Sequence, residues 1–210
     1  MKIKHTTPID AIRNFYIAEK LLPEILGSKK LTKTILENKL KSAVKKASRL
    51  SDEFILHESK NLLYPARYDN YLNSKWQVKE IYLKDCGVWP AFGGLPMIFC
   101  KGNVSDTASY IDDFIKNKNK LTLKTSRVLY IENLVTYADI IAKYVPIIVL
   151  EDHVIRHKKT HPLKERKFLT RTKYDIDDGN HRAVAMFIAG ATKTTALVGK
   201  RIYKNPFMYE

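Results

Sequence analysis

One short stretch, residues 174–185, holds the residue types best suited to phosphate chemistry. It combines a strand pattern, a turn at Gly179 and a helix pattern that begins immediately afterwards. Free backbone N–H groups and the positive end of the helix dipole make the first turn of a helix an anion site. His181 and Arg182 fall in that turn, where positive charge is unfavourable unless an anion is bound. The stretch therefore predicts a phosphate site.

Each polar residue of the stretch has a predicted role. Arg182 offers a planar guanidinium for phosphate, and His181 can exchange a proton near neutral pH. Asp177 and Asp178 are candidate Mg²⁺ ligands, and either could instead orient a hydroxyl nucleophile. The alternative is a plain turn in which Asp178 or Asn180 caps the helix and Arg182 pairs with a carboxylate. The predicted phosphate ligands are Gly179, Asn180, His181 and Arg182.

The same stretch resembles the motif of the ParB/sulfiredoxin superfamily. The resemblance covers about residues 125–203 and rests on the runs 146–149 and 178–182 and on Gly190 before a final strand. Members of this superfamily hold nucleotide phosphates at the equivalent turn. They include CTP-hydrolysing DNA clamps, ATP-using sulfinic acid reductases, free-serine kinases, and plasmid or phage ATPases and nucleases. The resemblance implies that ATP or CTP binds here, with Mg²⁺.

Differences from the superfamily's motifs shorten the list of activities that the resemblance implies. Sulfiredoxins carry a cysteine where this chain has Asn180, so sulfinic acid reduction is not expected. Partition clamps carry a more arginine-rich motif and two further segments, whereas only 28 residues follow Arg182 here. Free-serine kinases have the most similar motif, and they need an acidic base near the start of the domain. Glu132 is the candidate for that base.

The net charge favours a polyanionic partner. The 210 residues include 37 Lys and Arg against 22 Asp and Glu, a formal net charge of +15. Residues 29–49 hold eight basic residues and one acidic residue, and residues 156–173 hold the same numbers. Each segment thus carries a net charge of +7. Because the excess is confined to two segments, nucleic acid is the expected partner.

The first basic segment has the periodicity of a helix over residues 31–50. Leu36, Leu40, Ala43, Ala47 and Leu50 recur at steps of three and four and would form one apolar stripe. The far side would contact a phosphate backbone or, as the alternative, would only be solvated. The predicted contacts on that side are Lys41, Lys45 and Arg49.

The second basic segment is expected to form a long loop that enters the phosphate site. Loops of this length in compact domains usually have a function or are disordered. The predicted nucleic-acid contacts are Arg156, Lys159, Lys164, Arg166 and Arg171. His153, His157 and His161 lie four residues apart, a spacing that could hold a metal, but the pattern fits no established zinc motif. A polyanion-binding loop is therefore favoured over a metal site.

Other patterns predict a helical N-terminal region followed by mixed structure. Helices are expected at about 9–26, 31–50, 51–61 and 106–116, the last capped by Asn103 or Ser105, and a strand at 76–83. A group of aromatic residues could stack unpaired bases, although core packing is favoured. This group contains Tyr64, Tyr68, Tyr71 and Trp76.

Beyond residue 120, strands are expected at 127–131, 146–150, 173–176 and 194–198, and helices at 134–144 and 180–189. The predicted fold class is α+β with an α/β-like C-terminal part, in which a helical N-terminal region precedes a ParB/sulfiredoxin-like mixed sheet. The predicted domains are a helical region at 1–62, a mixed connecting region at 63–120 and the phosphate-binding domain at 121–210.

Composition excludes several classes of protein. With 45% hydrophobic residues the chain should form a real core, and its longest apolar runs are far shorter than the ~20 residues of a membrane span. The N-terminus lacks the pattern of a secretion signal, so a cytoplasmic protein without a membrane partner is expected. Cys86 and Cys100 are predicted to be buried and reduced. No haem, flavin or zinc–thiolate site is expected.

Three functions follow from these patterns. The leading one is an enzyme that binds nucleotide or nucleic-acid phosphates and performs phosphoryl transfer or phosphodiester or NTP hydrolysis, with His181, Asp178 and Glu132 as catalytic residues. The first alternative is a non-catalytic nucleic-acid-binding or inhibitor protein. The second is a small-molecule kinase of the serine-kinase type that uses ATP or ADP.

Overall fold

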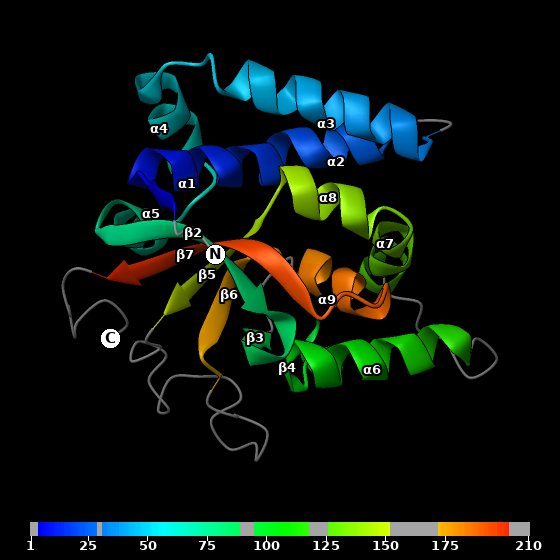
Figure 1. Cartoon of the computed structure of the whole chain (residues 1–210). Helices are drawn as coiled ribbons and strands as arrows, with labels where there is room; N and C mark the ends of the chain where they lie inside the picture. Colours follow the sequence, from blue (N-terminus) through cyan, green and yellow to red (C-terminus); the bar gives the residue numbers. More distant parts are fainter. Residues whose placement is uncertain (1–3, 29–30, 89–94, 118–125, 152–171, 202–210) are drawn as a thin grey trace.

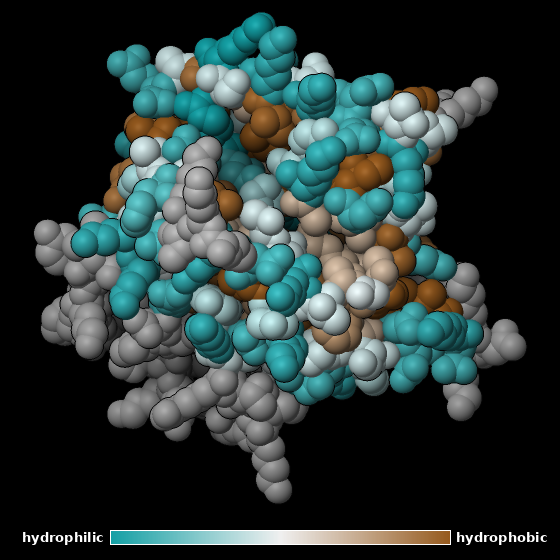
Figure 2. All heavy atoms as spheres, in the orientation of Figure 1, coloured by the Kyte–Doolittle hydropathy of each residue, from teal (hydrophilic) through white to brown (hydrophobic). Residues whose placement is uncertain are grey.

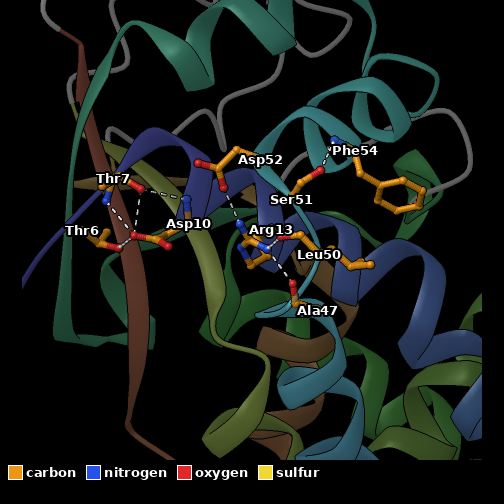
Figure 3. Close-up of polar contacts among 9 residues, drawn as sticks. All are labelled: Thr6, Thr7, Asp10, Arg13, Ala47, Leu50, Ser51, Asp52 and Phe54. Atoms are coloured by element: carbon orange, nitrogen blue, oxygen red, sulfur yellow. Dashed lines mark hydrogen bonds and ion pairs between the residues drawn. The ribbon is translucent and has the colours of Figure 1, made fainter.

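Three N-terminal segments form one continuous rod. The computed structural model describes residues 4–28, 31–88, 95–117, 126–151 and 172–201. In it, α1 (Pro8–Tyr16), a π-helical segment η1 (Ile17–Leu21) and α2 (Leu22–Leu26) follow one another without a break. Thr7 starts the rod with a capping box: its hydroxyl accepts from the Asp10 amide at 3.1 Å, and its own amide donates to the Asp10 carboxylate (Figure 3). The helix expected at 9–26 is confirmed, with a π-helical centre that was not foreseen.

Three further helices surround the rod. They are α3 (Lys33–Ala47), α4 (Asp52–Lys60) and α5 (Pro65–Leu72). The α3 helix lies along the rod on the side away from the sheet (Figure 1). Arg13 of α1 holds the α3–α4 junction: its guanidinium donates to the carbonyls of Ala47 and Leu50 at 2.5 and 2.9 Å and to the Asp52 carboxylate at 2.6 Å (Figure 3).

A seven-stranded mixed sheet lies under these helices, in the order β1-β2-β7-β5-β6-β3-β4. The β7–β5 and β6–β3 pairs are parallel and the other pairs are antiparallel. Because β2 pairs with β7 along its whole length, the two halves of the chain share this sheet. The strands are β1 (Lys4–Thr6), β2 (Ser74–Tyr82), β3 (Cys86–Val88), β4 (Gly102–Asn103), β5 (Ile147–Glu151), β6 (Tyr174–Asp178) and β7 (Lys193–Arg201).

Helices cover both faces of the sheet. The alternation of side chains along a strand sends Ile147 and Val149 of β5 to one apolar cluster and Ile148 to another. The first cluster includes residues of α6 (Val104–Lys116), α7 (Ser126–Val135), α8 (Ala138–Tyr144) and α9 (Asn180–Ile188). The second includes residues of α1, α4 and α5. Short 3₁₀ turns, η2 (Leu83–Asp85) and η3 (Met97–Phe99), complete the described elements.

One expected strand is wrong. Residues 127–131 belong to helix α7, in which Val128, Ile131 and Leu134 are buried at helical spacing. Neighbouring β-branched and aromatic residues favoured a strand, but packing against α9 decides the conformation. Helix α5 and strands β1, β3 and β4 lie outside the elements expected from the sequence. The described residues form helices and one sheet with both parallel and antiparallel strands, which is consistent with the predicted α+β class.

Several predictions about buried residues are confirmed. Tyr68, Tyr71 and Trp76 are core residues, whereas Tyr64 is exposed. Cys86 and Cys100 are buried and form no disulfide, and burial raises the pKa of each thiol to about 12. Within the described ranges, no helix has the length and apolar character needed to cross a membrane.

Candidate functional site

The predicted strand, turn and helix at residues 174–185 are present. Strand β6 ends at Asp178, Gly179 adopts φ +100°, and α9 begins at Asn180. A Cβ atom at Gly179 would lie 2.8 Å from Cγ2 of Ile147 and 3.0 Å from a guanidinium nitrogen of Arg182. Glycine is therefore required here both by the backbone conformation and by the protein's own side chains.

Arg182 is a structural residue in this conformation. It is 5% exposed, and its guanidinium donates to the carbonyls of Val145 and Pro146 at 2.5 and 3.1 Å. The same guanidinium pairs with the Asp178 carboxylate at 2.5 Å. These bonds join the start of α9 to the start of β5. The alternative in which Arg182 pairs with a carboxylate thus describes the geometry, and a phosphate would have to compete with these partners.

Asp177 is also held by protein groups. Arg67 of α5 donates to its carboxylate at 2.8 Å and to its backbone carbonyl at 2.7 Å. The Tyr71 hydroxyl donates to the same carboxylate oxygen at 2.7 Å. Both carboxylates predicted to bind Mg²⁺, those of Asp177 and Asp178, bind cationic side chains in this conformation. A Mg²⁺ ion at this turn stays a prediction. No group of three or more His, Cys, Asp and Glu residues in the described part of the chain could hold a metal.

His181 and Asn180 present polar atoms without partners. Burial, reinforced by the nearby charge of Arg127, lowers the pKa of His181 to about 4, so its imidazole is neutral at pH 7. Its ring packs edge-to-face on Tyr130 at a centroid distance of 5.6 Å. The Nε2 atom of His181 and the Oδ1 atom of Asn180 are buried and make no hydrogen bond with described residues. A neutral imidazole can exchange a proton but adds no positive charge for a phosphate.

Glu19 is the member of this site that sequence reasoning missed. It is an exposed residue of η1. Desolvation and then the Asp178 charge raise the pKa of Glu19, while the charges of Arg67 and Arg182 lower it. A second negative charge nearby favours the protonated form of a carboxyl group. Nothing in the local sequence connects Glu19 to the β6–α9 turn, because only the tertiary fold brings the rod there.

Glu132, the candidate for a catalytic base, lies in a helix, whereas a strand was expected at residues 127–131, immediately before it. It is half-buried within α7 and does not follow a strand. Helix α7 packs on α9, so Glu132 belongs to a neighbouring element of the turn. Its role as a base stays a prediction.

The structure places three of the eight predicted nucleic-acid contacts. Lys41 and Lys45 are exposed on α3, and Arg49 is exposed in the turn after α3, which ends at Ala47 rather than at residue 50. The other five and the three histidines of the second basic segment lie outside the described residues. These are Arg156, Lys159, Lys164, Arg166, Arg171, His153, His157 and His161.

Charges on α3 divide into two groups. On the side towards α8, Lys33 pairs with Asp139 at 3.4 Å, and Glu37 pairs with Lys143 at 2.7 Å. By contrast, Lys41, Lys45 and Arg49 form no ion pair with any residue that the structure describes, although Lys41 lies one helical turn after Glu37 and its charge helps to lower the pKa of that carboxyl. Hydrophilic residues predominate along the edge of the molecule where α3 lies (Figure 2). We term Lys41, Lys45 and Arg49 the α3 basic face. Their side chains are exposed and can contact an anionic partner.

Comparison of this chain with protein-family models, with curated proteins and with solved structures finds no match. Function is therefore argued from the geometry alone.

Proposed function

We propose that this protein binds nucleic acid through backbone phosphates, using the α3 basic face. The observation that carries the proposal is the exposure of Lys41, Lys45 and Arg49, none of which forms an ion pair with a residue that the structure describes. The apolar stripe of α3 packs inward through Leu36 and Leu40, so the cations project from the outermost helical layer (Figure 1). Phosphate contacts of this kind position a protein without specifying a sequence.

The composition of α3 favours a duplex over a single strand. Proteins that bind single strands combine cations with aromatic rings on which bases stack. Helix α3 contains no aromatic residue, and three of the four predicted stacking residues are buried in the core. Lys41 and Lys45 lie one helical turn apart, about 6 Å along the axis. A ridge of cations at this spacing suits the regular phosphates along a duplex.

A test compares a triple variant with a charge-matched control. In Lys41→Ala/Lys45→Ala/Arg49→Ala we expect weaker binding to duplex DNA, because each lost phosphate contact removes about 0.9 from the slope of log K against log salt. The magnitude of this negative slope should therefore decrease by about 2.7. The control removes three exposed lysines from β2, η2 and β7, in Lys75→Ala/Lys84→Ala/Lys200→Ala. Fluorescence anisotropy at several salt concentrations gives both slopes.

Equal losses of DNA affinity in the two triple variants would mean that net charge alone explains the binding. That result would contradict a role for the α3 basic face. Absence of duplex binding by the unmodified protein at low salt would reject the proposed function. Tighter binding to a single strand of the same sequence would contradict the choice of a duplex.

A second candidate function is phosphoryl transfer or phosphodiester or NTP hydrolysis at the β6–α9 turn. The specific observation in its favour is the setting of Glu19, whose pKa is raised by desolvation and by the charge of Asp178, because a raised pKa suits a group that exchanges protons near neutral pH. The buried, neutral imidazole of His181 lies beside the same turn. Against it, Arg182 and Asp177 are already bonded within the protein.

Turnover distinguishes the two candidates. We would incubate the protein with ATP or CTP and Mg²⁺, with and without duplex DNA, and measure released phosphate and cleaved DNA. Activity that Glu19→Gln abolishes and Glu24→Gln retains would support the enzyme; Glu24 is an exposed carboxyl of the same rod. The absence of any turnover would reject the enzyme and would leave nucleic-acid binding as the proposed function.

A further inference from the structure

The exposed side of α3 carries three parallel rows of side chains. Successive residues of an α-helix are rotated by about 100°, so residues four or seven apart lie nearly in line. Leu36, Leu40 and Ala47 are buried and mark the side of α3 that packs on η1, α2 and α8. The opposite side belongs to the outermost helical layer (Figure 1). Its rows are a central row of Asn38 and Ser42, a first flank of Lys41 and Lys45, and a second flank of Lys39 and Lys46.

Both flanks of the central row are basic. Lys41 and Lys45 lie about 40–80° to one side of this row, and Lys39 and Lys46 lie about 60–80° to the other side. Lys39 donates to the Ser28 hydroxyl at 2.7 Å, and this neutral partner leaves its charge uncompensated. None of the four lysines forms an ion pair with a residue that the structure describes. A duplex that touched only the first flank would leave the second flank without a phosphate partner.

The central row carries neutral side chains that suit base edges better than phosphates. The Asn38 amide has a donor and an acceptor that match N6 and N7 of adenine, and the Ser42 hydroxyl can donate or accept. Ile35 lies beside this row and is 42% exposed. A phosphate offers nothing to an apolar side chain, whereas the methyl group of thymine does. The middle of the exposed side thus has the chemistry of base contacts, and its two borders have the chemistry of phosphate contacts.

We propose that α3 enters the major groove of duplex DNA, with the central row against the base edges and each basic flank against the phosphates of one strand. The proposal rests on the proposed nucleic-acid binding and adds to it the second flank and a preference for particular base pairs. The groove is about 12 Å wide, and an α-helix with its side chains is about 10–12 Å in diameter, so each flank reaches the strand on its own side. Duplex RNA does not fit, because its A-form major groove is too narrow.

A variant of the second flank tests whether α3 lies within the groove. In Lys39→Ala/Lys46→Ala the magnitude of the salt slope for duplex DNA should decrease by about 1.8, because two phosphate contacts are lost. The matching double variant of the first flank should show an equal decrease. Lys75→Ala/Lys84→Ala, at exposed lysines of β2 and η2, is the control and should retain the slope. A decrease for the first flank alone would overturn the proposal and would place α3 along one strand.

A filled major groove gives a measurement that needs no variant. Duplex DNA in which the cytosines carry a glucosylated 5-hydroxymethyl group keeps its backbone charge, but glucose occupies the major groove. We expect the unmodified protein to bind it about tenfold more weakly than ordinary DNA of the same sequence, because base contacts are lost. Equal affinity for the two duplexes would overturn the major-groove proposal and leave phosphate binding intact. Absence of binding to ordinary duplex DNA would reject nucleic-acid binding itself.

Asn38→Ala tests the base contacts of the central row. Duplexes that the unmodified protein selects from a random pool should share preferred base pairs. Asn38→Ala should lose about fivefold or more of the preference at one position, with an unchanged salt slope. Asn61→Ala, at an exposed asparagine that follows α4, should select the same duplexes as the unmodified protein. A pool without shared base pairs, an unchanged preference in Asn38→Ala, or equal affinity for duplex RNA would each overturn the proposal.

Discussion

At the scale of single residues, the turn at residues 177–182 shows how a motif can serve the fold before it serves a ligand. Arg182 and Asp177 look like ligands for phosphate and metal in the sequence, yet both bind partners within the protein. At this turn, the polar atoms that make no hydrogen bond with described residues are Nε2 of His181 and Oδ1 of Asn180. A residue type therefore sets what a side chain can bind, and its neighbours set what it does bind.

Gly179→Ala provides a test at this scale. It adds the strain of a positive φ, about 1–2 kcal/mol for a residue with a side chain, and a clash with Ile147 that costs about 1–3 kcal/mol more. The matched control is Gly190→Ala, which has φ +92° but no atom within 4 Å of the added Cβ. Urea unfolding should show a loss of about 3 kcal/mol for the first variant and about 1 kcal/mol for the second. Equal losses would mean that only backbone strain matters at Gly179.

At the scale of elements, the N-terminal rod organises its surroundings. Through Arg13 it fixes the α3–α4 junction, and through Asn14, which donates to the Pro146 carbonyl, it meets the start of β5. The rod therefore links α3, which carries the α3 basic face, to the sheet. Its helical character could be predicted from the cap at Thr7 and the apolar period, but its π-helical centre could not, because that depends on the packing of its two flanks.

Arg13→Ala tests the role of the rod in positioning α3. The variant loses bonds to two backbone carbonyls and to Asp52, and we expect it to be about 2–3 kcal/mol less stable, with faster amide exchange at residues 47–52. Arg49→Ala, which removes an exposed arginine two residues after α3, serves as the control and should change stability little. Unchanged exchange at the junction in Arg13→Ala would show that apolar packing alone holds it.

At the scale of the whole molecule, residues distant in the sequence form common apolar clusters. Leu36 and Leu40 of α3 belong to the same cluster as Ile147 of β5 and Val184 of α9. Strand β2 pairs with β7 over nine residues, and each face of the sheet contains side chains from both halves of the chain. This arrangement favours unfolding of the described core as one cooperative unit across the predicted boundaries at 62 and 120.

Leu40→Ala tests cooperativity at this scale. A fully buried leucine cut to alanine costs about 2–5 kcal/mol, and the loss should appear in a single transition by every probe. In a Trp89→Phe background, tryptophan fluorescence reports on Trp76 and hence on the second apolar cluster, and far-UV circular dichroism reports on all helices. Ile35→Ala, at a residue 42% exposed on the same helix, is the control and should cost far less. Separate transitions for the two probes would instead support independent domains.

The sequence by itself determined the local elements with strong periodic or capping signals. Examples are the rod, α3, α4, β2, and the strand, turn and helix around Gly179, because apolar spacing and cap chemistry depend on neighbouring residues. It failed at 127–131, where β-branched residues form a helix because they pack on α9.

Only the tertiary structure decided which groups meet. Contacts such as Tyr71 with Asp177, Arg67 with Asp177 and Asn14 with Pro146 join residues that share no periodic pattern. Their pairing depends on where whole helices pack on the sheet, and burial then sets the pKa values and the partners of the polar groups. The sequence therefore specified the chemical groups available at the β6–α9 turn, and packing decided which of them stay free.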